Sequence, residues 1–72
     1  MSRPANDEMV RGFMDGYDLT APEPSANRSA SYRHGFMVGR IDKGVIQWSG
    51  PAEALERMAD AAMDEDDRKA LQ

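Results

Sequence analysis

The residues that could do chemistry are few in this chain of 72 residues, which has one histidine and no cysteine. Without a thiol there is neither a thiolate nucleophile nor a cysteine ligand for zinc. His34 is the one side chain whose unperturbed pKa lies near neutrality, and its neighbour Arg33 is a cation rather than an orienting carboxylate. We therefore predict no catalytic residue, no metal site and no cofactor, and we expect that the chain is not an enzyme.

The net charge of −4 hides a basic middle segment. Residues 1–24 carry −3, residues 25–48 carry +3 and residues 49–72 carry −4. The middle segment is therefore the candidate for contact with an anionic partner. Its cations and two aromatic residues form the predicted nucleic-acid-binding set, which is Arg28, Arg33, Arg40, Lys43, Tyr32 and Trp48.

Spacing and side-chain chemistry both favour this interpretation. Arg33 and Arg40 are seven residues apart and lie near one face of a helix, and a guanidinium can bind phosphate in a bidentate way. Tyr32 and Trp48 can stack on bases. The alternative is that these charges form a solvated face or pair with the chain's own acidic C-terminal helix.

Acidic residues dominate the C-terminal third. Four of them recur at spacings of three or four, which places them along one side of a helix; they are Glu53, Glu56, Asp60 and Asp64. Such a row can imitate a nucleic-acid backbone before a basic groove, or keep the protein in solution. The run 64–67 lacks the alternating ligands and bend glycine of a calcium loop. We interpret residues 64–72 as an acidic tail.

Hydrophobic periodicity predicts an all-α domain over residues 1–72, with helices at 7–17, 29–43 and 51–63. Asn6 is expected to cap the first helix, because its side chain can accept a backbone N–H. Gly44 is expected to end the second in the left-handed conformation. Either Ser49 or Gly50 is expected to cap the third helix. Pro22 and Pro24 make residues 18–28 an extended connector.

The motif Gly-Phe-Met-x-Gly occurs twice, at residues 12–16 and 35–39. A glycine inside a helix costs about 1 kcal/mol relative to alanine, so four of them require a compensating gain. Small residues four apart lie on one helix face and allow a second backbone to approach closely. We therefore predict an antiparallel helix pair, covered by the third helix, that crosses at Gly12, Gly16, Gly35 and Gly39. The alternative is a chance similarity in a chain rich in glycine and methionine.

The predicted core is thin, because Leu, Ile, Val and Phe number only ten. Such a core supplies about 3–5 kcal/mol, so we expect oligomerisation or docking on a larger partner. No apolar run approaches the roughly 20 residues that cross a bilayer, and no secretory leader is visible. We expect a cytoplasmic protein that does not enter a membrane.

Part of the chain resembles the ribosome modulation factor family, over residues 11 to about 40. The matching positions combine an Arg-Gly-aromatic motif, a proline in the connector and a second Gly-aromatic motif; they are Arg11, Gly12, Phe13, Gly16, Pro22, Arg28, Ser29, Tyr32, Gly35 and Phe36. The resemblance implies a compact two-helix protein that binds ribosomal RNA and helps to inactivate ribosomes during slow growth. Similar patterns occur in small bacterial and phage proteins.

This chain departs from the family in three ways. Family members are strongly basic, the interval between Arg-Ser and the next aromatic residue is one residue longer here, and residues 45–72 add an acidic extension. The leading prediction is a non-enzymatic regulator that binds the ribosome or structured RNA. The alternative is a phage-related inhibitor that uses the acidic third helix and exposed methionines against a host protein.

Overall fold

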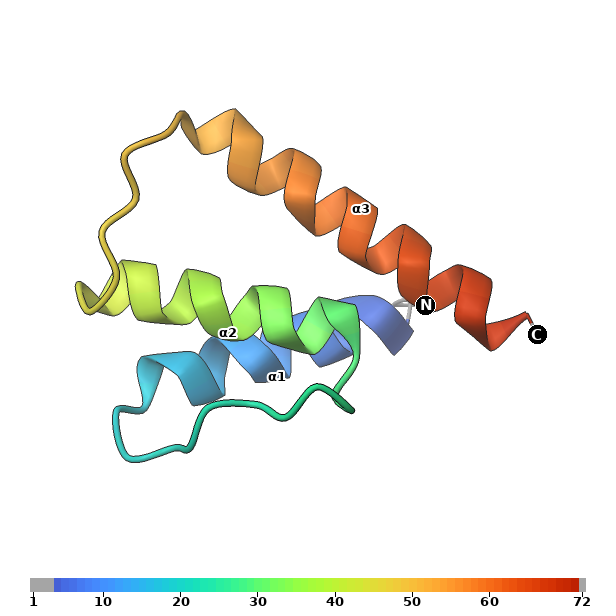
Figure 1. Ribbon diagram of the computed structural model, residues 1–72, viewed down its shortest axis with the longest axis horizontal. Coiled ribbons are helices and arrows are strands. Elements are labelled where there is room, and N and C mark those ends of the chain that lie inside the picture. Colours follow the sequence, from blue (N-terminus) through green and yellow to red (C-terminus); the bar gives the residue numbers. More distant parts are fainter. Residues whose placement is uncertain (1–3, 72) are drawn as a thin grey trace.

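The computed structural model describes residues 4–71, which form three helices and no strand. The helices are α1 (Pro4–Tyr17), α2 (Ala30–Lys43) and α3 (Ala52–Ala70). Figure 1 shows α1 and α2 packed side by side, with α3 crossing above them and approaching their N-terminal ends through its own C-terminal half. The prediction of an all-α fold with a close helix pair and a third helix is confirmed.

The ends of α2 follow from its flanking residues. The Ser29 side chain accepts a hydrogen bond from the backbone N–H of Tyr32 at 3.0 Å, as an N-cap does. Gly44 adopts φ 90° and donates its N–H to the carbonyl oxygens of Arg40 and Ile41. The predicted left-handed end at Gly44 is confirmed.

The predicted start of the first helix is wrong, and so are the predicted cap and end of the third; the predicted end of the first helix at Tyr17 is confirmed. The helix α1 already begins at Pro4, so Asn6 lies inside it and is not its cap; proline suits a first turn, where its missing N–H has no partner in any case. Pro51 occupies the N-cap position of α3 without a side-chain hydrogen bond, so neither Ser49 nor Gly50 is the cap. It also continues through residues 64–67 to Ala70, where the sequence predicted an acidic tail.

The charge arrangement of the last turns favours the longer helix α3. Glu65 and Lys69, four residues apart, form an ion pair at 3.7 Å, and Arg68 and Lys69 stand in the last turn. Cations there interact favourably with the carbonyl groups that end a helix.

The helices α1 and α2 run parallel, so the predicted antiparallel arrangement is wrong. Near the start of both helices, the Ser29 hydroxyl donates to the Glu8 carboxylate at 3.3 Å. Near the end of both, the Arg40 guanidinium donates to the Gly16 carbonyl at 2.9 Å. A parallel pair needs a connector that returns along the whole helix, which is about 21 Å for 14 residues. Residues 18–29 can span that distance because an extended chain covers up to about 3.3–3.6 Å per residue.

The four predicted glycines form the crossing itself. A Cβ at Gly12 would overlap the carbonyl oxygen of Tyr32, and one at Gly16 would overlap that of Phe36. A Cβ at Gly35 of α2 would likewise overlap the Met9 carbonyl oxygen of α1, and one at Gly39 would overlap that of Phe13. The hydrogens that replace these side chains point at carbonyl oxygens, a weakly favourable contact. Close backbone approach is therefore what the four glycines provide.

The crossing has an internal two-fold relationship. Each contact has an equivalent in which the α1 residue is replaced by the residue 23 positions later and the α2 residue by the residue 23 positions earlier. The Gly12–Tyr32 contact thus corresponds to Gly35–Met9, and the Gly16–Phe36 contact corresponds to Gly39–Phe13. The repeated motif thus places equivalent residues at equivalent levels of two parallel helices.

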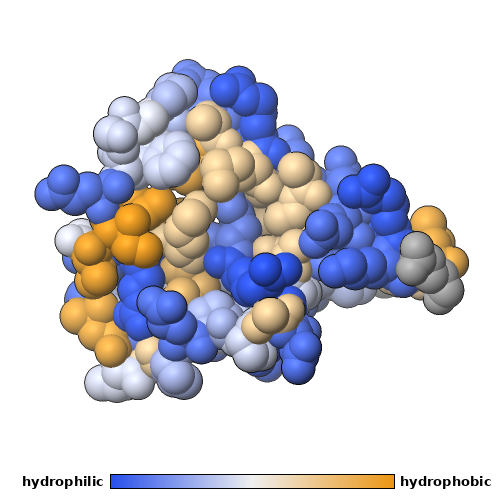
Figure 2. All heavy atoms as spheres, viewed as in Figure 1, coloured by the Kyte–Doolittle hydropathy of each residue, from blue (hydrophilic) through white to orange (hydrophobic). Residues whose placement is uncertain are grey.

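The buried part of the molecule is small and lies mainly on α2. Among the described residues the buried apolar side chains are Ala5, Tyr32 and Phe36, and α3 contributes no buried residue. Figure 2 shows hydrophobic residues gathered between α3 and the helix pair, and a second group near the end of α2. The helix α3 therefore covers the pair only in part.

Candidate functional site

Arg40, which the sequence assigns to phosphate contact, is 8% exposed and is bonded to the connector. Its Nη1 donates to the carbonyl oxygens of Gly16 at 2.9 Å and Asp18 at 3.1 Å, and its Nη2 donates to that of Ala21 at 2.9 Å. Its guanidinium also lies over the Phe36 ring, 4.6 Å from the centroid. Three of the five guanidinium N–H groups are thus bonded to backbone carbonyl oxygens, and little of the side chain is exposed to a phosphate.

Tyr32 is also an internal residue, 6% exposed. Its hydroxyl donates to the Asp15 carboxylate, and this hydrogen bond together with burial raises the pKa of Tyr32. The Arg28 guanidinium lies over the ring, 3.7 Å from its centroid. The Tyr32 ring is therefore not presented as a surface on which a base could stack.

The remaining predicted residues are on the surface but are not gathered together. Arg33 is exposed, and its Nε donates to the Arg28 carbonyl at 3.2 Å. Lys43 lies ten residues further along α2, about 15 Å away along the axis, with its Nζ 4.6 Å from the centroid of the Tyr17 ring. Trp48 is 37% exposed, and its indole N–H donates to the Pro51 carbonyl at 3.2 Å.

The predicted acidic row is present on α3. Glu53, Glu56, Asp60 and Asp64 are all exposed. A further acid of the run 64–67, Asp66, is half-buried and contacts the start of α2, which helical spacing alone does not predict. Its Oδ1 accepts from the backbone N–H of Ala30 at 3.1 Å, and its Oδ2 accepts from that of Ser31 at 2.8 Å.

Asp66 thus serves as a cap supplied by another helix. Burial disfavours its charged form, but hydrogen bonding to Ser31 and to the Ala30 N–H outweighs this, so the pKa of Asp66 is lowered. The positive end of the α2 dipole favours a carboxylate at this position. The acidic segment therefore contacts the backbone at the N-terminus of α2, whereas the alternative stated from the sequence is pairing with basic side chains.

His34 is 9% exposed and lies between α2 and α3. Burial lowers the pKa of His34, and a hydrogen bond to the backbone of Leu55 offsets part of this effect. The charged ring is therefore less favoured in the folded protein than in the unfolded chain. Its place in the helix interface supports a packing role.

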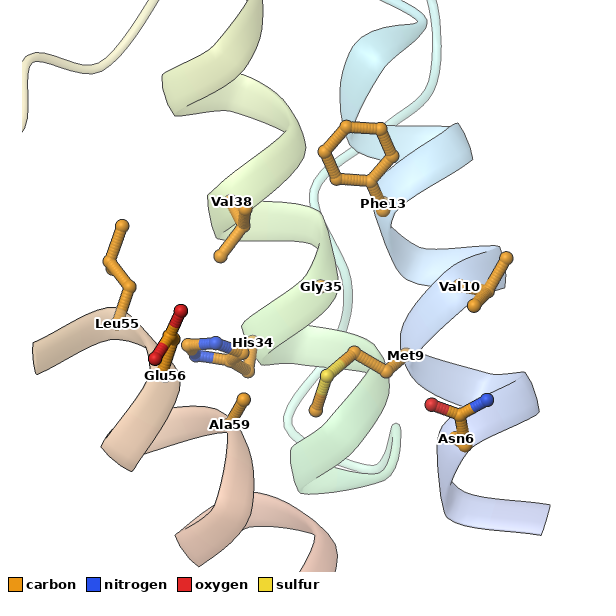
Figure 3. Close-up of a pocket in the computed structure, with 10 residues that line it drawn as sticks. All are labelled: Asn6, Met9, Val10, Phe13, His34, Gly35, Val38, Leu55, Glu56 and Ala59. Carbon is orange, nitrogen blue, oxygen red and sulfur yellow. The ribbon is translucent and has the colours of Figure 1, made fainter. Parts of the chain in front are cut away.

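An apolar groove opens between α3 and the helix pair, and we call it the α3-side groove. It encloses about 300 Å³, which is the small end of the range for ligand sites. Figure 3 shows residues of all three helices around it; they are Asn6, Met9, Val10, Phe13, His34, Gly35, Val38, Leu55, Glu56 and Ala59. No motif predicted this groove, because its walls come from three separate segments.

Within residues 4–71, no three His, Asp or Glu side chains are placed so that they could hold a metal ion. In the same part of the chain, no helix combines the length and the apolar character needed to cross a membrane. Comparison with protein-family models, with curated proteins and with solved structures finds no match for the chain.

Proposed function

We propose that the chain is a small non-enzymatic regulator that binds the ribosome or structured RNA in the cytoplasm. One observation carries the proposal: the glycine and phenylalanine residues of the family resemblance are those at the helix crossing. Gly12, Gly35 and Phe36 are buried there, and Phe13 provides a carbonyl contact. The residues of the resemblance therefore act together in one structural unit, which supports extending the comparison to the whole helix pair.

The structure narrows the residues available for phosphate contact. Arg40 and Tyr32 are buried. The other four residues of the predicted set are exposed, namely Arg28, Arg33, Lys43 and Trp48. Arg33 and Lys43 are the two cations of α2 that keep an exposed side chain. They are the residues that we expect to contact an RNA backbone.

A salt titration of binding to ribosomes or to a structured RNA tests this proposal. The logarithm of the binding constant decreases linearly with the logarithm of the salt concentration, and this slope should become less steep by roughly 0.7–0.9 for each phosphate contact removed. We expect the variant Arg33→Gln/Lys43→Gln to lose affinity and slope. The matched control Arg57→Gln/Arg68→Gln removes two exposed cations of α3 and should bind as the native chain does. Absence of binding at low salt would overturn the proposal.

A second candidate function, inhibition of another protein, is supported by the acidic row beside an apolar groove. Glu56 belongs both to the row and to the groove wall. Negative charge next to an apolar surface is the arrangement that a basic protein partner requires. This candidate corresponds to the phage-related alternative.

A further inference from the structure

We propose that the α3-side groove binds a basic amphipathic helix of another protein; this inference rests on the second candidate function. The helix would insert apolar side chains between α1 and α3 and would direct Lys or Arg residues toward the acids of α3. Four observations lead to this partner.

The first observation is that the helix pair has two equivalent grooves whose equivalent side chains are covered to different extents. The 23-residue relationship converts Met9 and Phe13 of the α3-side groove into Tyr32 and Phe36 on the opposite side. There the connector lies against the helix pair, with Pro24 beside Phe36 and Pro22 beside Tyr32. Tyr32 and Phe36 are 6% and 4% exposed, whereas Met9 and Phe13 remain half-buried. The α3-side groove lacks the corresponding cover.

The second observation concerns which side chains the open groove would accept. Asp15 and Arg33 flank the connector side, and their equivalents 23 residues away are Val38 and Val10, both on the wall of the α3-side groove. The replacement of an acid and a cation by two valines makes this groove apolar. It therefore suits apolar side chains rather than a polar extended segment.

The third observation is the arrangement of the walls. The helix α3 packs on α2 and touches α1 little, so the open position lies between α1 and α3. Three helices with one such open position leave room for the fourth member of a helix bundle. Figure 3 shows Phe13 and Val10 on one side of the space and Leu55 and Ala59 on the other. A helix across the opening can insert side chains spaced by three or four residues.

The fourth observation is charge. Glu56 lies on the groove wall, and Glu53 and Asp60 continue the same exposed side of α3. The chain as a whole carries −4. A second copy carries the same net charge of −4, whereas a basic helix would complement the acids of this surface.

A synthetic amphipathic helix of leucine and lysine is the probe, and its binding to the full chain is measured by fluorescence anisotropy. Two further peptides serve as controls: a scrambled one of the same composition, and one in which glutamate replaces lysine. We expect the leucine–lysine helix to bind with a Kd at least about tenfold lower than either control. Equal binding of the scrambled peptide, or of the glutamate peptide, would overturn the proposal.

Variants of the chain locate the site. Val10→Asp places a charge at the groove, and we expect it to weaken binding of the leucine–lysine helix by at least about tenfold. Val45→Asp is the matched control, since Val45 is 56% exposed and Val10 is 52% exposed; binding should not change.

The acidic residues of α3 are tested separately. Glu53→Gln/Glu56→Gln should weaken binding of the leucine–lysine helix, and Glu23→Gln/Asp42→Asn, with the same change in charge, should not. Circular dichroism checks that each variant is folded.

Two results would assign the groove to another occupant and overturn the proposal. One is a dimer in sedimentation equilibrium that dissociates in the Val10→Asp variant, which identifies a second copy. The other is RNA binding that Val10→Asp abolishes. RNA binding that depends on Arg33 and Lys43 but not on Val10 would leave both proposals standing, so their failures are distinguishable.

Discussion

The carboxylate of Asp66 lies 2.8 Å from the backbone nitrogen of Ser31, 35 residues earlier in the chain. It accepts a second hydrogen bond from the N–H of Ala30 at 3.1 Å. One side chain of α3 thereby satisfies two donors at the start of α2. The helix α3 has no buried residue, and these two hydrogen bonds join its C-terminal half to the helix pair.

Replacing Asp66 with alanine should therefore loosen α3. The free energy of unfolding should fall by about 1 kcal/mol, as for the loss of an N-cap, and amides of α3 should exchange faster with solvent. Asp60→Ala is the matched control, because Asp60 is exposed on the same helix; its effect should stay within about 0.5 kcal/mol. Equal effects of the two substitutions in denaturant titration and hydrogen exchange would contradict the capping role.

The stability of the protein should fall as the pH is lowered below about 6.5, through His34. Burial lowers the pKa of His34 in the folded protein, so the unfolded chain binds the proton more readily. Stability is then complete above the unfolded value, near 6.5, and is lost as the pH falls toward the folded value. Leu55 and Glu56 face His34 from α3 (Figure 3) and do not reverse this direction.

Thermal melts between pH 5 and 7.5 measure this dependence, and His34→Gln should remove it. The lowered pKa of Asp66 affects stability in a separate and more acidic pH range. The stabilisation from Asp66 is present above 3.8, the ordinary pKa of an aspartate, and is lost as the pH falls below it. Unchanged pH dependence in His34→Gln between pH 5 and 7 would show that another group is responsible.

Local patterns in the sequence were sufficient to predict three helices and the crossing at the glycines. They were not sufficient to predict every helix limit or the relative direction of the two paired helices. The spacing of Gly12 from Gly16 identifies a face, and that face is the same whether the partner runs parallel or antiparallel. The repeated motif at residues 35–39 does not decide the direction either, because a two-fold axis can relate equivalent residues in a parallel or in an antiparallel pair. The direction is given by the contacts between the helices, in which Gly12 faces Tyr32 and Gly39 faces Phe13.

The internal roles of charged residues could not be predicted from sequence. Arg40 and Arg33 are alike in type and helical phase, yet one is buried against connector carbonyl groups and the other is exposed. Asp66 is one of four consecutive acids, and only the angle at which α3 crosses α2 places it at the helix start. Such roles depend on contacts between distant segments, which periodicity does not encode.

Replacing Arg40 with methionine should destabilise the protein by about 3 kcal/mol. The long apolar side chain keeps the packing on Phe36, but it leaves the carbonyl groups of Gly16, Asp18 and Ala21 without their charged donor, and hydrogen bonds to charged groups contribute about 1.5–3 kcal/mol. Arg33→Met is the matched control on the same helix and should change stability by about 0.5 kcal/mol or less. Chemical denaturation compares the two, and similar losses would contradict the internal role of Arg40.

The two-fold relationship predicts that Gly12→Ala and Gly35→Ala are equally damaging. Each new methyl group would overlap a carbonyl oxygen of the facing helix, at Tyr32 or at Met9 respectively. Overpacking of this kind costs about 1–3 kcal/mol or more, which is a large share of the stability of a small domain. Gly50→Ala is the control, because the nearest atoms to a Cβ there belong to the Trp48 side chain, at 3.1 Å, rather than to a backbone. Denaturant titration of the three variants should give two similar large losses and one small change. A loss confined to one of the two crossing glycines would show that the helices do not meet symmetrically.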